Sequence, residues 1–404
     1  SRGLGDVYKR QILYSKEEIK MSERFVLNET AYFGRGCRTE LSNEIKTRGF
    51  NKVLVVTDKA LYECGVTGKV TQILDEAGIA YEVYSEVKPN PTVKNVQDGV
   101  AKCKESGADV IVAVGGGSAM DTAKGISIIM TNPDRADVVS LNGASNTANK
   151  GMPMIALPTT HGTAAEVTIN YVITDEERKV KMVCVDPHDI PILAIVDSEL
   201  MESLPKGTAA ATGLDALTHA VEGYITKAHN TMSDMFHMRA IELIFENLPK
   251  AVNEKDPKAI ENMSIAQYMA GMGFSNVGLG IVHSMAHQLG AVYDTPHGIA
   301  NAILLPTVMR FNGEVCADRF REILCHIGRP DARDLNDQDV INTFVWKITE
   351  LSKAVGVTQT VKDTGCKEED LEMLAEKAME DPCKPGNPRE VTKEDFIRLY
   401  REAM

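Results

Sequence analysis

The sequence has no long hydrophobic run and no excess of positive charge, and each absence disfavours a class of protein. No stretch approaches the roughly 20 apolar residues that a membrane-spanning helix needs, so we expect no membrane insertion. The formal net charge is −13 at pH 7. Because phosphate backbones and anionic lipids need a basic surface, nucleic acid and membranes are disfavoured as main partners.

Cysteine is present, but never as a closely spaced pair. Eight cysteines are scattered along 404 residues, without any Cys-x-x-Cys motif. This pattern argues against a disulfide framework and a zinc ribbon, and it indicates reduced thiols. The amino terminus also lacks the charged, apolar and small-residue order of a secretion signal. We therefore expect a cytoplasmic protein.

The first 20 residues look foreign to the rest of the chain. Residues 6–11 match a translated sequencing adapter, and the segment before Met21 could encode a ribosome-binding site. We hypothesise that residues 1–20 are a non-native extension and that the natural protein, from a bacterial fragment, begins at Met21. An ordinary extension is the alternative.

The chain from Met21 to Leu204 alternates short apolar runs with helical patterns. Helices are expected at 67–77 and 93–106, and a β-hairpin over 167–185 with its turn at 175–178. Five runs rich in Val and Ile predict buried strands at 52–57, 80–85, 109–115, 154–158 and 192–197. This order favours a mostly parallel sheet with helices on its faces.

From Pro205 onward the strand signals end and long amphipathic patterns follow. They predict helices at 213–224, 231–248, 259–274 and 281–289, with more toward the carboxyl terminus. Because 404 residues exceed what one core normally supports, two domains are expected. We predict an α/β dinucleotide-binding domain over 21–204 and an all-helical domain over 205–404.

A glycine-rich turn follows the predicted strand 109–115 and opens a helix. Gly115, Gly116, Gly117 and Ser118 let backbone N–H groups approach an anion, and the helix dipole favours negative charge there. The turn suits a pyrophosphate, although it is not the G-x-G-x-x-G fingerprint. The alternative is a tight turn without a ligand.

Polar residues also follow two other predicted strands. Thr159, Thr160 and Thr163 come after the strand 154–158, at the sheet edge where α/β folds bind ligands. Asp58 closes the strand 52–57, where a carboxylate can bind an adenosine ribose and repel a 2′-phosphate. That position favours NAD over NADP, but a strand-end aspartate can equally cap a helix.

Histidines supply the sharpest signal in the helical part. Asp215 and His219 are four apart on a predicted helix, His283 and His287 repeat this spacing, and His297 follows. One carboxylate with several imidazoles suits Fe²⁺ or Zn²⁺ better than Mg²⁺ or Ca²⁺. The spacing does not distinguish whether His283, His287 or both would coordinate, and buried structural histidines are the alternative.

These motifs resemble the iron-dependent (group III) alcohol dehydrogenases, over essentially residues 21–404. The resemblance rests on residues 115–118 with Asp121 and on residues 158–160 with 162–166, 213–223 and 273–298. The hairpin through Pro191, together with residues 271–276, is similar to the lactaldehyde reductase (propanediol oxidoreductase) subfamily.

The resemblance implies a dehydroquinate synthase-like fold and a homodimer that transfers hydride between NAD(H) and a small alcohol or aldehyde. It implies that Asp215, His219, His283 and His297 bind Fe²⁺, with Zn²⁺ as the alternative metal. The implied catalytic group is His287, Asp121 and Lys181, where His287 lies beside the metal and helps to move a proton. Around the cofactor it implies Asp58, Asn90, Gly116, Gly117, Ser118, Thr159, Thr160, Thr163, Asn170 and Lys181.

The resemblance also places Phe274 and Cys383 near the substrate. His161 and Gln288 depart from the usual family pattern. The expected reaction converts lactaldehyde and NADH to 1,2-propanediol and NAD. Dehydrogenases of short-chain alcohols, butanol or 1,3-propanediol are the alternatives, as is an NAD- and metal-using lyase of the dehydroquinate synthase type. A ligand-binding module with a vestigial site is the non-enzymatic alternative.

Overall fold

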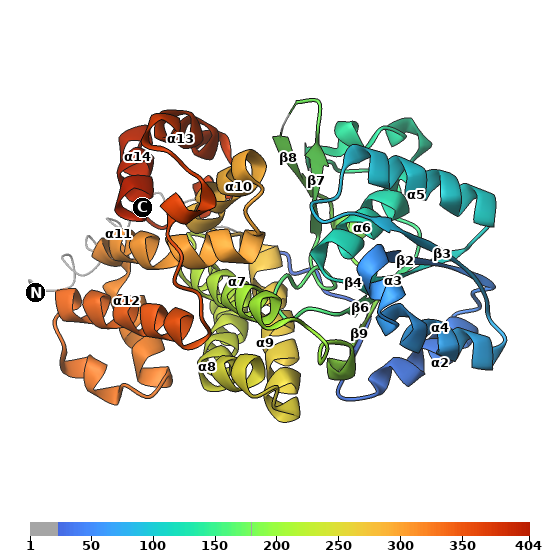
Figure 1. The fold of residues 1–404 in the computed structure, drawn as a ribbon, viewed down its shortest axis with the longest axis horizontal. Helices are drawn as coiled ribbons and strands as arrows, with labels where there is room; N and C mark the ends of the chain where they lie inside the picture. Colours follow the sequence, from blue (N-terminus) through green and yellow to red (C-terminus); the bar gives the residue numbers. More distant parts are fainter. Residues whose placement is uncertain (1–22, 179) are drawn as a thin grey trace, which may run out of the picture.

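The computed structural model describes residues 23–178 and 180–404, which form two halves side by side (Figure 1). The strands and their covering helices occupy one half, and helices α7 to α14 form the other. The expected non-native extension, residues 1–20, lies outside the described residues.

A six-stranded parallel sheet in the order β1-β9-β6-β4-β2-β3 forms the centre of the α/β half. Five of its strands confirm the predicted apolar runs, whereas β1 was not predicted because its sequence, TAYF, contains no long apolar run. The strands are β1 (Thr30–Phe33), β2 (Lys52–Asp58), β3 (Ala80–Val87), β4 (Val110–Gly115), β6 (Met154–Pro158) and β9 (Leu193–Val196).

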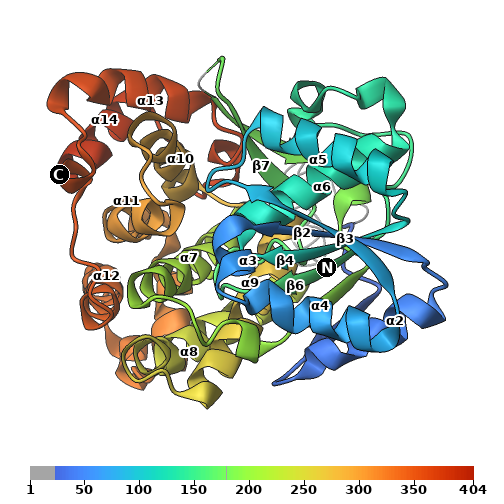
Figure 2. The ribbon, with the colours of Figure 1, turned by 45° about the vertical axis from the view of Figure 1, so that its right-hand side comes forward.

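Helices cover both faces of this sheet, as Figure 2 shows. On one face, Val53 and Val55 of β2 pack with α2 (Glu40–Thr47) and α4 (Val66–Ala77). On the other face, Leu54 and Val56 pack with the helices α5 and α6. The short α3 (Lys59–Glu63) follows β2, α5 spans Val93–Ser106 and α6 spans Gly117–Thr131. Alternate residues of a central strand thus enter two separate cores.

The predicted hairpin is confirmed as β7 (Asn170–Asp175) paired antiparallel with β8 (Val180–Val185). With β5 (Gly143–Ala144) it forms a second sheet in the order β5-β8-β7. The Asp175 carboxylate accepts hydrogen bonds from the backbone amides of Glu177 and Arg178, which stabilises the turn.

The helical half shares one hydrophobic core, to which α7 contributes a nearly continuous buried stretch. Its predicted helices are confirmed, but α8 continues beyond its predicted end at Leu248, through Pro249, because Ala251 and Val252 pack into the core. The helices are α7 (Lys206–Ile225), α8 (Thr231–Asn253), α9 (Pro257–Val277), α10 (Ile281–Tyr293), α11 (His297–His326), α12 (Asp337–Ala354), α13 (Leu371–Glu380) and α14 (Lys393–Glu402).

The predicted fold class is confirmed: an α/β half with a mostly parallel sheet precedes a helical half. In the part of the chain that the structure describes, no helix has the length and apolar character needed to cross a bilayer.

Candidate metal and dinucleotide site

A cavity of about 220 Å³ lies between the two halves and collects most of the predicted site residues. From the α/β half it is lined by Asn90, Gly117, Ser118, Asp121, Thr163, Asn170 and Lys181. From the helical half it is lined by Asp215, His219, Phe274, His283, His287, His297 and Cys383. Asp58, Gly116, Thr159 and Thr160 are not among its lining residues.

Four of these side chains converge from three helices. Asp215 and His219 lie one turn apart on α7, His283 lies in the first turn of α10, and His297 begins α11. Their potential ligand atoms all lie within 4.8 Å of one another. The Asp215 Oδ1 atom is 3.6 Å from His297 Nε2 and 4.0 Å from His283 Nε2. We refer to these four residues as the tetrad.

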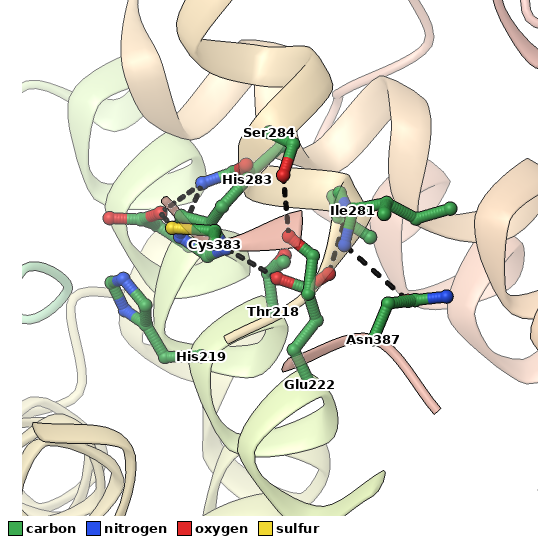
Figure 3. Close-up of polar contacts among 12 residues, drawn as sticks. Thr218, His219, Glu222, Ile281, His283, Ser284, Cys383 and Asn387 are labelled. Carbon is green, nitrogen blue, oxygen red and sulfur yellow. Dashed lines mark hydrogen bonds and ion pairs between the residues drawn. The ribbon is translucent and has the colours of Figure 1, made fainter. Parts of the chain in front are cut away.

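Hydrogen bonds behind two of the rings determine which nitrogen is free. The Nδ1 of His283 donates to Glu222 Oε2 at 2.5 Å, and the Nδ1 of His219 donates to the Gly162 carbonyl at 3.3 Å. Figure 3 shows Glu222 on α7 with its carboxylate directed toward His283 and the start of α10. Carboxylate and carbonyl oxygens only accept hydrogen bonds, so each Nε2 retains a lone pair for a ligand.

The electrostatics of the tetrad fit a divalent transition metal. Burial lowers the pKa of His283 and His297 well below the usual range, which keeps both imidazoles neutral. Burial by itself raises the pKa of Asp215, but the neighbouring His219, His297 and His283 outweigh it and the pKa is lowered. A buried carboxylate beside three imidazoles is a donor set suited to Fe²⁺ or Zn²⁺.

The polar contacts of Asn301 support the same conclusion. Its Nδ2 lies 2.7 Å from Asp215 Oδ1 and 3.1 Å from the Nε2 atoms of both His283 and His297. An amide carries two hydrogens and cannot satisfy three acceptors at once. Within the described residues the Asn301 Oδ1 atom is buried without a partner. The acceptor atoms of the tetrad therefore exceed the available donors, as expected where a cation completes the site.

His287 is not part of the tetrad. The sequence spacing alone could not distinguish His287 from His283 as a metal ligand. The Nδ1 of His287 bonds to Asp381 Oδ2 at 2.8 Å, and its ring stacks on His297 with centroids 5.5 Å apart. The other oxygen of Asp381 accepts the backbone amide of Cys383 at 2.9 Å. Asp381 thus fixes the ring of His287 and leaves Nε2 as its free nitrogen.

The glycine turn forms the start of α6 and faces the cavity. No side chain caps this 15-residue helix at Gly116, so its first amides are free for an anion. A Cβ atom at Gly116 would lie 3.0 Å from Thr160 Cγ2, and one at Gly117 would lie 3.2 Å from Thr163 Cγ2. Glycine is needed here for close packing of the 159–163 loop, which leaves Thr160 Oγ1 buried without a partner in the described chain.

The remaining predicted polar residues of the α/β half line the cavity and have hydrogen-bond partners of their own. Burial raises the pKa of Asp121 to about 7, and its Oδ2 accepts the Val172 amide at 3.1 Å. Lys181 Nζ donates to Asn90 Oδ1 at 2.8 Å. Burial lowers the pKa of Lys181, while Asp294 and Asp121 oppose this shift. The backbone carbonyl of Asn170 accepts from the buried Lys124 at 2.9 Å.

Asp58 and the two predicted substrate residues occupy distinct environments. Asp58 caps α3 by accepting the Leu61 amide at 2.9 Å, which is the structural alternative considered for it. Phe274 stacks on His219 with centroids 4.3 Å apart, and Cys383 lies on the same cavity wall. The divergent His161 is buried and does not line the cavity, and burial lowers its pKa to about 4.

Sequence reasoning did not identify Glu222, Asn301 or Asp381 as parts of the site. Glu222 lies two turns after Asp215 on the same face of α7, and Asn301 lies one turn after His297. Both could have been found by extending the helical spacing of the tetrad. Asp381 lies beyond α13 and had no such signal.

Comparison with known proteins assigns the family. The model of the iron-containing alcohol dehydrogenases matches residues 28–198, and that of the carboxyl-terminal part of the Fe-containing alcohol dehydrogenase family matches residues 209–404. Lactaldehyde reductase from Escherichia coli (strain K12) is 50% identical over 383 residues, which cover 95% of this chain and 100% of that protein.

Solved structures agree with this assignment. A crystal structure of a 1,3-propanediol oxidoreductase, 39% identical, superposes with a TM-score of 0.91 over 95% of this chain and 100% of that one. A sulfoacetaldehyde reductase from Bifidobacterium kashiwanohense in complex with NAD⁺ is 28% identical, with a TM-score of 0.85 over 95% and 99% of the two chains. The chain therefore belongs to the iron-containing alcohol dehydrogenase family and is an oxidoreductase.

Proposed function

We propose that this protein is an NAD(H)-dependent lactaldehyde reductase that interconverts lactaldehyde and 1,2-propanediol with Fe²⁺ in the tetrad. One observation carries the proposal: the tetrad and the uncapped start of α6 line the same cavity. A cation site and a pyrophosphate site then lie in one space between two halves of the chain, where a dinucleotide and a small alcohol can meet.

Each part of the cavity has a defined task in this proposal. Asp215, His219, His283 and His297 hold the cation, which supplies Lewis-acid polarisation of the substrate oxygen while NAD(H) supplies or accepts the hydride. The amides of Gly117 and Ser118, together with the α6 dipole, bind the pyrophosphate of the cofactor. Asn90, Thr163, Asn170 and Lys181 position the cofactor, and Asp121 lines the cavity beside Lys181.

The outer residues Asp58, Gly116, Thr159 and Thr160 belong to the adenosine side of the proposed cofactor site. Gly116 and Thr160 support it by packing the 159–163 loop against the start of α6. The Asp58 oxygen that does not cap α3 can accept hydrogen bonds from the adenosine ribose.

His287 is the proposed proton carrier. Because Asp381 engages Nδ1, the free Nε2 can donate a proton toward the product oxygen during reduction and accept one during oxidation. Asp381 keeps the ring in one orientation through its contact with Nδ1.

The substrate assignment rests on the 50% identity to lactaldehyde reductase and on the composition of the cavity wall. Phe274, which stacks on His219 of the tetrad, adds apolar surface to the cavity lining together with Cys383, Val172 and Val183, which suits a short carbon chain with few hydroxyl groups. The likeness to a 1,3-propanediol oxidoreductase makes the 1,3-diol the second candidate substrate.

The test is a substrate panel with metal-free protein resupplied with Fe²⁺ or Zn²⁺. We expect NADH oxidation with lactaldehyde to exceed that with 3-hydroxypropanal and butanal, and Fe²⁺ to restore more activity than Zn²⁺. Consumption of NADH must match product formation, which excludes a lyase that regenerates its cofactor. An absence of metal-dependent NADH oxidation with every aldehyde would refute the proposal.

Other expectations stay predictions. They are a homodimer in solution, a cytoplasmic location, a domain division at residues 204/205, and a natural start at Met21. The oligomeric state is measurable by sedimentation of the purified protein, and the start by amino-terminal sequencing of the native protein.

A further inference from the structure

A carboxylate of the helical half contacts a cavity-lining residue of the α/β half. Asp294, at the carboxyl end of α10, accepts a hydrogen bond from Asn90 Nδ2 at 2.7 Å, although 204 positions separate the two residues. Asn90 Oδ1 in turn accepts from Lys181 Nζ at 2.8 Å. A continuous chain of hydrogen bonds, which we name the clasp, thus joins Asp294, Asn90 and Lys181.

The clasp fixes the orientation of the Asn90 amide. A carboxylate only accepts and an ammonium only donates, so the amide nitrogen must face Asp294 and the oxygen must face Lys181. Asn90 and Lys181 line the cavity, whereas Asp294 does not. Asp294 therefore acts on the cavity through Asn90.

The backbone around the clasp is suited to this contact. Asn90 and Asp294 both adopt left-handed backbone conformations, with φ of 52° and 53°. The Lys181 side chain passes over Gly290, one turn before Asp294, where a Cβ atom would lie 3.1 Å from Nζ. A larger residue at 290 would push the ammonium away from Asn90.

The position of Lys181 identifies the part of a dinucleotide that the clasp would meet. Lys181 lines the same cavity as Ser118 and Asp121 at the start of α6 and as the four residues of the tetrad. Its Nζ lies against Gly290 of α10, the helix that carries His283. Lys181 therefore faces the space that joins the pyrophosphate end of the cavity to the metal end. In a dinucleotide that spans these two points, the intervening group is the nicotinamide ribose.

We propose that Asp294 is a positioning residue for the cofactor, which holds Asn90 and Lys181 as a fixed pair for the nicotinamide ribose hydroxyls. The inference rests on the proposed function. Because the helical half supplies Asp294 and the α/β half supplies its partners, the clasp also orders the two halves for cofactor binding before the cofactor arrives.

Two substitutions separate the side chain from the backbone. Asp294→Gly removes the acceptor and accommodates the left-handed backbone, whereas Asp294→Asn keeps an acceptor and also tolerates that backbone. Calorimetric titration of the metal-loaded protein with NADH, without substrate, should give about tenfold weaker binding for Asp294→Gly. Asp294→Asn should stay within about twofold of the unsubstituted protein.

Two controls make the result specific. ADP lacks the nicotinamide ribose, so both variants should bind it as the unsubstituted protein does. Lys255→Gly changes an exposed residue at another left-handed position, with φ of 52°, and should leave NADH binding unchanged. In steady-state assays, Asp294→Gly should raise the KM for NADH with little change in kcat.

Unaltered NADH binding by Asp294→Gly would overturn the role of the clasp while leaving the proposed function intact. Equal weakening of NADH and ADP binding would also overturn it, because the effect would then be a general loosening of the fold. An unsubstituted protein that binds neither nucleotide would overturn both the clasp and the proposed function.

Discussion

Replacing Glu222 with glutamine tests whether a buried charge behind His283 holds this residue as a metal ligand. The two carboxylate oxygens have different partners: Oε1 accepts the Val282 amide at 2.7 Å, and Oε2 accepts His283 Nδ1 at 2.5 Å. Glutamine offers one oxygen and one NH₂ group. Either the Val282 amide or His283 Nδ1 must then face the NH₂ group of the glutamine. In the second case the His283 ring can accept from this group only by moving its proton to Nε2, and Nε2 then loses the lone pair that would bind the metal.

The size of the effect follows from these contacts. A hydrogen bond to a charged group contributes about 1.5–3 kcal/mol, and loss of an outer partner of a metal-bound histidine weakens metal binding about 10- to 100-fold. The two figures agree, because each tenfold change in affinity corresponds to about 1.4 kcal/mol. We therefore expect Glu222→Gln to weaken Fe²⁺ or Zn²⁺ binding by one to two orders of magnitude.

The assay is competition for the metal with a chelator, followed by the metal content of the protein. Glu166→Gln is a matched control, because Glu166 is equally buried and burial raises the pKa of both carboxyls to about 7. Glu166 bonds to Gln267 and not to a tetrad residue. Equal metal affinity of the two variants would refute the reasoning.

Three further perturbations test the tetrad, the cofactor site and the stability of the fold. His283→Ala should abolish metal-dependent turnover while NADH binding persists in titration; normal turnover without retained metal would contradict the tetrad. Asp58→Gly should relax the preference for NADH over NADPH and, because glycine is a tolerated cap, cost only a few tenths of a kcal/mol in stability; unchanged NADPH kinetics would count against Asp58 as a cofactor residue. Burial raises the Glu166 pKa from 4.5 to about 7, so the folded chain binds more protons than the unfolded chain between these values. The free energy of unfolding should fall as the pH rises through that range, and urea unfolding should show a flatter dependence for Glu166→Gln.

Most of the fold could be predicted because its signals are local. The central strands are short apolar runs buried on both faces, and β4 begins one residue later than expected because the Asp109 carboxylate binds the amides of Asn51 and Lys52. Edge strand β1 was missed because its residues are only partly buried or exposed, so no continuous apolar run marks them. The two-residue strand β5 is too short to leave any periodic signal.

The candidate site shows the same division between local and distant information. Helical spacing brought Asp215 together with His219, and His283 with His287, because a separation of four residues places side chains on one face. The same spacing did not distinguish which of the two histidines of α10 would bind the metal. The distinction between them comes from partners far along the chain: Glu222, 61 positions away, turns His283 toward Asp215, and Asp381, 94 positions away, holds His287 apart.

These distant partners share one chemical feature that explains why no local pattern reveals them. Three carboxylates, Glu222, Asp381 and Asp294, each accept a hydrogen bond from a residue that we expect to touch the metal, the substrate or the cofactor. A carboxylate in that position sets the tautomer or orientation of its partner without approaching the ligand itself. Its position depends only on where the fold places a donor, so any element can supply it: α7 for His283, the segment after α13 for His287, and the end of α10 for Asn90. Replacing Glu222 or Asp381 with its amide, or Asp294 with glycine, should therefore alter ligand affinity or proton transfer more than it alters the stability of the fold.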